Sequence, residues 1–155
     1  MKTPHFPLKE LYNNDFYNWL QEQVRLLREQ QWEQIDIVNL IEELETLGRQ
    51  ERRELVNRLG ILLGHLLKWQ YQPELRGTSW QATIREQRRK ITRLLQQSPS
   101  LKPYLEEAVQ EGYEDGLDLA VRETGLSYKV LPESCTYKLD QLFDPDFFPE
   151  DKDNL

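Results

Sequence analysis

The sequence predicts an all-α protein with four main helices, a short C-terminal helix and an extended tail. Proline, the residue that most strongly breaks helices, is absent from residues 8–72, 74–98 and 104–131. The chain has 26 leucines against six isoleucines and six valines, a balance that favours helices over strands. No stretch of useful length alternates apolar and polar residues as a half-buried strand does. We therefore expect a mostly antiparallel bundle with the tail laid across it.

The first helix is expected to begin behind Asn13 or Asn14, which are good N-cap residues, and to end near Gln30. Its apolar residues fall on one face of a helix with 3.6 residues per turn. The residues expected to face inward are Phe16, Trp19, Leu20 and Leu27, with Val24 at the edge.

The second helix is expected to begin after Asp36 and to end before Pro73. Apolar residues keep helical spacing over some 30 residues, at Ile37, Leu40, Ile41, Leu44, Leu47, Leu55, Leu59, Leu62 and Leu66. Gly60 and Gly64 lie one turn apart in this helix, and Gly112 and Gly116 lie one turn apart in a later one. Such pairs predict a close approach of helix backbones, with two helices contacting the stretch around Gly64.

The third helix is expected behind a cap at Thr78 or Ser79 and should stop before Pro99. The fourth is expected from about residue 101 to residue 124. Gly125 then tolerates the left-handed conformation of a C-cap.

The last 30 residues are rich in Pro and Asp and hold one short helical candidate at residues 137–143. The chain of 155 residues has a length typical of one domain, which we expect to span residues 1–155 with an ordered core at about 11–150. The apolar fraction of 38% is low, so we expect a lean core and some apolar surface covered by another copy or a partner.

Composition excludes several classes of protein. The chain has one cysteine, Cys135, which cannot form an intramolecular disulfide. No apolar run approaches the length of a membrane-spanning helix, so we expect no membrane partner. The first residues lack the apolar core of a signal peptide, and a cytoplasmic protein is expected.

Charge is distributed in three blocks that the net charge of −7 conceals. Residues 1–48 and 94–155 are acidic, and residues 49–93 are basic. Within the basic block, Arg85, Arg89 and Arg93 form one stripe of the third helix, opposite its apolar face. We expect these three to be exposed and available to an acidic protein or a polyanion, and Arg88 to be packed or ion-paired internally. The alternative is a solvated face that acidic helices neutralise.

Catalytic signals are weak. Glu51, Arg58 and His65 recur every seven residues along the edge of the apolar stripe and are interpreted as a buried polar seam. His65 has no Glu three residues before it, so the ligand pair of di-metal bundles is missing and no metal or other cofactor is expected. No Ser or Cys stands in a turn suited to nucleophilic catalysis.

Several segments resemble one bacterial family, abundant in cyanobacteria, that is known as domain of unknown function twenty-nine. The similar segments are residues 40–49 (LIEELETLGR), 65–74 (HLLKWQYQPE), 79–80 (SW), 84–89 (IREQRR), 98–101 (SPSL), 132–137 (PESCTY) and 144–150 (DPDFFPE). The resemblance implies an all-helical cytoplasmic domain and brings no catalytic or ligand residues. We therefore expect a non-catalytic interaction module that binds a protein partner or self-associates. The alternatives are a nucleic-acid-binding accessory protein that uses the basic third helix, and an enzyme with an unrecognised site.

Overall fold

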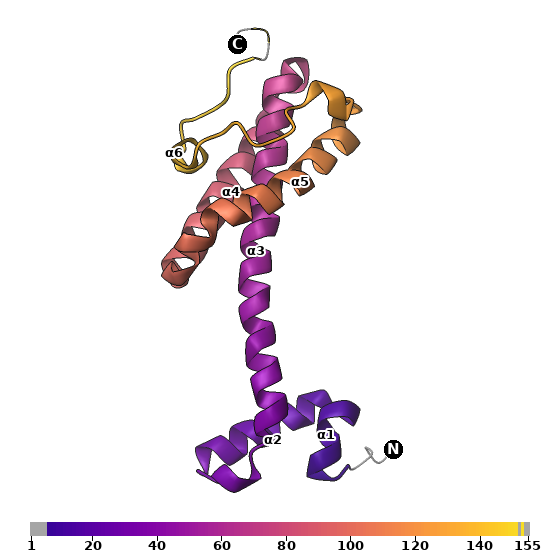
Figure 1. The fold of residues 1–155 in the computed structure, drawn as a ribbon, viewed down its shortest axis with the longest axis vertical. Coiled ribbons are helices and arrows are strands. Elements are labelled where there is room, and N and C mark those ends of the chain that lie inside the picture. Colours follow the sequence, from indigo (N-terminus) through magenta and orange to yellow (C-terminus); the bar gives the residue numbers. More distant parts are fainter. Residues whose placement is uncertain (1–5, 152, 154–155) are drawn as a thin grey trace. The chain divides into compact units, whose positions relative to one another are not determined.

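The computed structural model describes residues 6–151 and 153, and these residues form α-helices and short 3-10 helices without a strand (Figure 1). The predicted all-α class is therefore confirmed. The α-helices are α1 (Leu8–Asn14), α2 (Phe16–Arg28), α3 (Ile37–Tyr71), α4 (Thr78–Gln97), α5 (Leu105–Thr124) and α6 (Leu139–Phe143).

The chain divides into two compact units, one ending at Arg49 and the other beginning at Gln50. The first unit holds α1, α2 and the start of α3, and the second holds the rest. That residues 1–155 fold as a single cooperative domain stays a prediction.

The start of the first unit differs from expectation. A short helix, α1, precedes the predicted first helix, and the side chain of Asp15 caps α2 by accepting a hydrogen bond from the Asn18 backbone N–H. The prediction of a cap at Asn13 or Asn14 is wrong because both residues complete α1. Phe16 and Leu27, predicted to face inward, are exposed.

The core of the first unit is small. Leu11, Trp19 and Leu26 are buried, and the ring of Tyr12 packs edge-on against Trp19 at 4.9 Å between centroids. Asp36 joins this core to α3. Its Oδ2 accepts a hydrogen bond from Trp19 Nε1 at 3.0 Å, and its Oδ1 accepts one from the Asn39 backbone N–H and so caps α3 as predicted.

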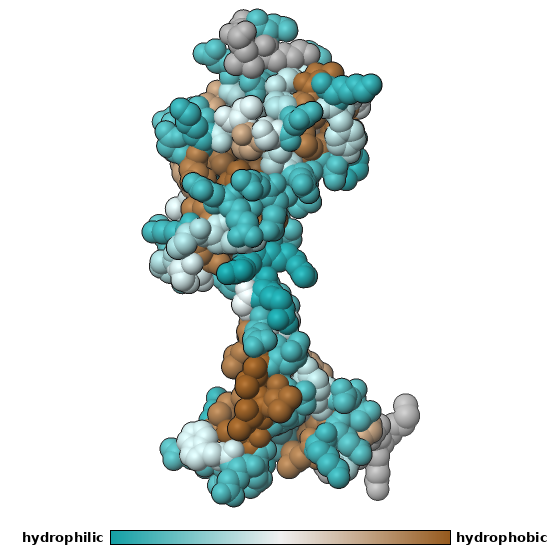
Figure 2. Space-filling view, in the orientation of Figure 1, coloured by the Kyte–Doolittle hydropathy of each residue, from teal (hydrophilic) through white to brown (hydrophobic). Residues whose placement is uncertain are grey.

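The first half of α3 leaves most of its apolar stripe uncovered. Val38 is 79% exposed and Leu44 60% exposed, although helical spacing places them among apolar neighbours. Figure 2 shows the result as an apolar patch over this part of the helix. The exposed apolar residues of the patch are Ile37, Val38, Ile41, Leu44 and Leu47.

In the second unit, α4 and α5 pack on the second half of α3, and the three helices alternate in direction (Figure 1). Gly60 and Gly64 of α3 meet Gly112 and Gly116 of α5. A methyl group added to Gly116 would lie 2.9 Å from the Gly64 backbone nitrogen and 3.1 Å from the Gly60 oxygen. The predicted close approach of backbones is confirmed. On another side of α3, Arg58 contacts Gln87 of α4.

The observed start of α4 and start of α5 differ from the predicted boundaries, whereas the end of α5 agrees with them. Gly77, and neither Thr78 nor Ser79, stands at the N-cap of α4, and no side chain caps that end. A 3-10 helix at Pro99–Tyr104 replaces the predicted start of the next α-helix because Pro103 cannot donate a backbone hydrogen bond there. Gly125 ends α5 with φ of 74°, which confirms the predicted left-handed C-cap.

The C-terminal segment lies against α3 and α4. Its helix α6 starts at Leu139, two residues later than predicted, where the Gln141 side chain accepts a hydrogen bond from the Lys138 backbone. Leu142 is fully buried, and the ring of Phe148 packs on Trp69 at 4.7 Å between centroids. Among the residues that the structure describes, no helix is long and apolar enough to cross a membrane.

Candidate functional site

The arginine stripe of α4 lies where the sequence predicts it. Arg85, Arg89 and Arg93 are exposed, and Arg88 is buried. The one acidic residue in this stretch, Glu86, forms an ion pair with Lys90 at 2.6 Å. Within the described part of the chain, no carboxylate lies within 4 Å of the three exposed guanidinium groups. None of these three charges therefore forms a direct ion pair with a described residue of a neighbouring helix.

The stripe forms one wall of a groove between α4 and the C-terminal segment. A hollow of about 440 Å³ is bounded on the α4 side by the four arginines together with Thr92 and Gln96, and on the other side by Phe143 and Pro145. Its α4 residues follow the spacing of one helix face. Among residues 6–151 and 153, no acidic side chain lines this hollow, which we call the arginine pocket.

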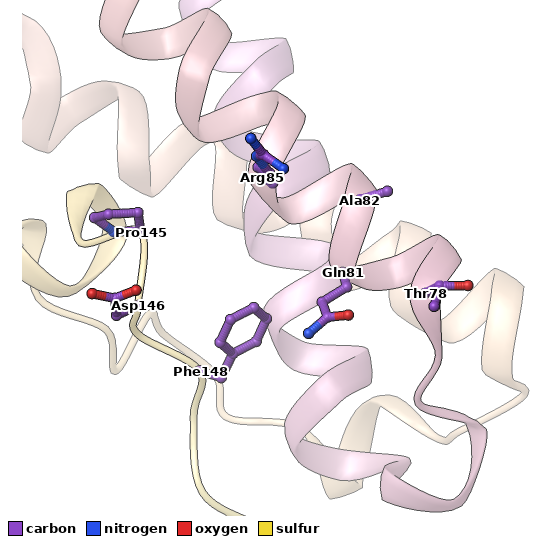
Figure 3. A pocket seen from close by; sticks show the side chains of 7 residues that line it. All are labelled: Thr78, Gln81, Ala82, Arg85, Pro145, Asp146 and Phe148. Carbon is purple, nitrogen blue, oxygen red and sulfur yellow. The ribbon is translucent and has the colours of Figure 1, made fainter.

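A second hollow of about 500 Å³ continues the groove towards the start of α4. Figure 3 shows Thr78, Gln81, Ala82 and Arg85 on α4, with Pro145, Asp146 and Phe148 on the C-terminal segment. Asp146 introduces a negative charge here, so the two hollows differ in electrostatic character although Arg85 and Pro145 border both.

Arg88 connects the two walls of the groove by hydrogen bonds from α4 to α6. Its Nε donates to the Leu142 carbonyl at 2.9 Å and its Nη2 to the Gln141 carbonyl at 3.1 Å. These carbonyls belong to the last turn of α6, where the Gln141 carbonyl also accepts a hydrogen bond from the Asp144 backbone N–H at 3.3 Å. Arg88 thereby fixes the wall that α6 contributes, in agreement with the prediction that it packs internally.

The Arg88 guanidinium is buried without a carboxylate of the described chain in direct contact. The side chain is 5% exposed, and its Nη1 is buried without a hydrogen-bond partner. Burial lowers the pKa of Arg88, and the negative charge of Asp144 opposes that effect. The ring of Phe148 lies 5.8 Å from the guanidinium carbon. The floor of the groove thus carries a cation that no carboxylate neutralises by direct contact.

The three residues of the predicted polar seam lie along α3 without meeting one another. Glu51 accepts a hydrogen bond from the Ser98 hydroxyl, and Arg58 pairs with Glu54. His65 is buried and bonds through Nδ1 to the Ile61 carbonyl at 2.9 Å. Glu51 and Arg58 reach residues at the end of α4 and within it, whereas His65 bonds within α3, and the three form no common site.

His65 instead lies beside the buried Lys68, with 3.5 Å between His65 Nε2 and Lys68 Nζ, and Lys68 reaches the exposed Glu123. Lys68, which is 4% exposed, pairs with Glu123 of α5 at 2.5 Å and lies over the ring of Trp80. Burial lowers the pKa of His65, and the adjacent charge of Lys68 acts in the same direction. The sequence analysis did not identify Lys68 or Glu123. Residues 6–151 and 153 contain no group of three or more His, Cys, Asp or Glu side chains that could hold a metal ion.

Sequence reasoning identified one wall of the groove and missed the other. Thr92 and Gln96 could have been found, because they lie seven and eleven residues after Arg85 and so share its helix face. Phe143 and Pro145 could not, because nothing in the sequence pairs the C-terminal segment with α4.

Comparison with curated proteins and with solved structures finds no match for this chain. A family model described as domain of unknown function DUF29 matches residues 11–148. This range includes α4, the α6 segment and therefore both walls of the groove. The chain belongs to the DUF29 family.

Proposed function

We propose that this protein is a non-catalytic interaction module and that its α4 groove binds an acidic segment of a protein partner. The observation that carries the proposal is the arginine stripe, three exposed guanidinium groups in succession with no carboxylate of the described chain within 4 Å. Guanidinium groups bind carboxylates through two parallel hydrogen bonds, which gives recognition of direction as well as charge.

The shape of the groove favours a chain segment as the ligand. Its two hollows adjoin at Arg85 and Pro145 and run along α4 from Thr78 to Gln96. Phe143 and Phe148 provide apolar surface beside the charged stripe. Interfaces commonly combine aromatic contacts with charged positions in this way.

A binding assay with a defined polyanion tests the proposal. Fluorescence anisotropy would follow labelled poly-L-glutamate binding to the parent and to the triple reversal Arg85→Glu, Arg89→Glu, Arg93→Glu. The matched control reverses Arg28, Arg53 and Arg122, which are also exposed, and changes the net charge equally. We expect the triple reversal to abolish binding and the control reversal to retain most of it.

Thermal melts of the same proteins complete the test. Because no carboxylate of the described chain contacts the stripe, the triple reversal should melt close to the parent temperature. A large loss of stability without any change in association would contradict the proposal and would assign the arginines an intramolecular role. Tighter binding of duplex DNA than of poly-L-glutamate, with a log–log salt slope of about −0.9 per phosphate contacted, would favour the nucleic-acid alternative.

Self-association through the first half of α3 is a second candidate function. Its apolar residues, Ile37 to Leu47, are exposed on one helix, and patches of this kind commonly mark interfaces. An antiparallel copy with a two-fold axis near Glu42 would place Ile37 opposite Leu47 of the partner copy and Leu40 opposite Leu44, so the two apolar faces would cover one another.

Sedimentation velocity tests this second candidate. The parent should sediment as a dimer at high micromolar concentration, and Leu44→Arg should sediment as a monomer because a charge then lies in the apolar face. Leu75→Arg is the control, since Leu75 is also exposed but lies in the second unit. A monomeric parent would exclude a second copy as the occupant of the patch.

A further inference from the structure

The arginine pocket concentrates positive charge more strongly than a carboxylate requires. Four arginines, Arg85, Arg88, Arg89 and Arg93, line one hollow of about 440 Å³ that no acidic side chain of the described residues lines. A carboxylate brings one negative charge, whereas a phosphate monoester brings nearly two at neutral pH and offers three strong acceptor oxygens. The charge of the pocket therefore matches a dianion better.

The floor of the pocket supplies an independent observation. Arg88 is 95% buried by its surroundings, since its side chain retains 5% exposure, and its Nη1 has no partner. Donors in that position are rare in native structures, because an unsatisfied buried donor is costly. The buried charge of Arg88, which no carboxylate of the described chain contacts, adds to the positive potential of the pocket that it lines and favours an anion there.

The geometry also keeps Arg88 in place before a ligand arrives. Two hydrogen bonds to the Leu142 and Gln141 carbonyls fix the plane of its guanidinium. A cation held in this way loses little conformational freedom on binding, and preorganisation of this kind increases affinity. Arg85, Arg89 and Arg93, which are exposed, would close on the outer oxygens of the ligand.

The remaining side chains fit an ester better than a free ion. Thr92 adds a hydroxyl donor to the same wall, and Phe143 and Pro145 form the apolar wall opposite. Free inorganic phosphate would leave that apolar wall without a contact, whereas the carbon chain of a phosphorylated residue would cover it.

We propose that the arginine pocket is a phosphate-monoester subsite, with Arg88 as its buried anchor, and that the partner segment is recognised in a phosphorylated form. This inference rests on the proposed function, because it names the chemistry of one residue in the acidic segment. Arginine clusters are a recurrent means of reading phosphorylated motifs.

The test uses the full chain and three versions of one acidic synthetic peptide, with Ser, Asp or phosphoserine at the central position. Isothermal titration calorimetry should show the phosphoserine peptide binding at least about tenfold more tightly than the Asp peptide. Equal affinities of the Asp and phosphoserine peptides would overturn the subsite and leave the acidic-partner function standing. Binding of none of the three peptides would overturn both.

Two variants test whether the tighter binding of the phosphoserine peptide arises in the arginine pocket. Arg88→Lys keeps the charge but cannot satisfy both α6 carbonyls, so the phosphoserine preference should fall to near that of Asp. Thr92→Val removes a hydroxyl from the α4 wall and leaves every charged residue in place. It should reduce the preference for phosphoserine over Asp less than Arg88→Lys does. Retention of the full preference in Arg88→Lys would contradict the anchor.

A measurement on the parent keeps the anchor testable even if Arg88→Lys does not fold. Nitrogen-15 NMR of the arginine side chains should show the Arg88 Nε–Hε resonance shifting when phenyl phosphate is added, with a smaller shift for benzoate. The control resonance is Arg28, an exposed arginine of the first unit. Equal shifts at Arg88 and Arg28 would show non-specific charge binding and would overturn the subsite.

Discussion

Replacing Gly116 by alanine should destabilise the protein even though alanine is the better helix former. The added methyl group would lie 2.9 Å from the Gly64 nitrogen, 3.1 Å from the Gly60 oxygen and 3.2 Å from Leu63 Cβ. Two of these atoms are backbone, so no change of side-chain rotamer relieves the contact. The axes of α3 and α5 must then separate locally.

The magnitude follows from two opposing terms. Alanine gains about 1 kcal/mol of helix propensity over glycine. Overpacking in a well-packed core costs about 1 to 3 kcal/mol, and contacts with rigid backbone place Gly116 at the upper end of that range. We therefore expect Gly116→Ala to lower the free energy of unfolding by about 2 kcal/mol.

Gly48→Ala is the matched control. Gly48 is also within a helix, but an added methyl group would meet no atom within 4 Å. It should gain about 0.5 to 1 kcal/mol of stability through propensity alone. Urea unfolding followed by circular dichroism at 222 nm measures both variants. A Gly116→Ala protein as stable as the parent would refute the close approach of α3 and α5.

Three further predictions concern the second unit. Gly64→Leu should destabilise by about 1 to 3 kcal/mol in urea unfolding, because its Cβ would meet Leu119 Cδ2 at 2.8 Å and the Gly116 oxygen at 3.1 Å. Arg88→Met should cost about 1 to 3 kcal/mol, because the Leu142 carbonyl loses the Arg88 donor and the Gln141 carbonyl keeps only the Asp144 N–H, and limited proteolysis should then cut near α6 sooner than in the parent. His65 should make stability fall as pH drops below about 6.5, because the unfolded chain binds a proton there that the folded chain, with its lowered pKa, does not. His65→Gln should remove that part of the pH dependence in melts between pH 7 and 5, and an unchanged profile would show that His65 does not cause it.

The fold was predictable from the sequence where local signals and packing agree. Proline positions define the ends of α3 and α4, and Gly125 ends α5, because backbone constraints act within a few residues. The helical spacing of residues 37–47 was detected correctly. It does not reveal that this face remains exposed, since burial depends on which neighbouring element covers the face.

The candidate site shows the same division. The periodicity of α4 separates the exposed arginines from Arg88, because direction around a helix follows from sequence position. The opposite wall depends on a long-range contact between Arg88 and the α6 carbonyls, 53 and 54 residues away. The acidic residues of the C-terminal segment gave no signal that would pair it with α4.

The most direct test of the account is to map where an acidic ligand binds. Titration of poly-L-glutamate into protein with nitrogen-15-labelled arginines should shift the side-chain resonances of Arg85, Arg88, Arg89 and Arg93 together, with one binding curve. Arg28 and Arg53, which are arginines outside the groove, should shift little. Equal shifts at all exposed arginines, or shifts confined to Arg28 and Arg53, would contradict the α4 groove as the binding site.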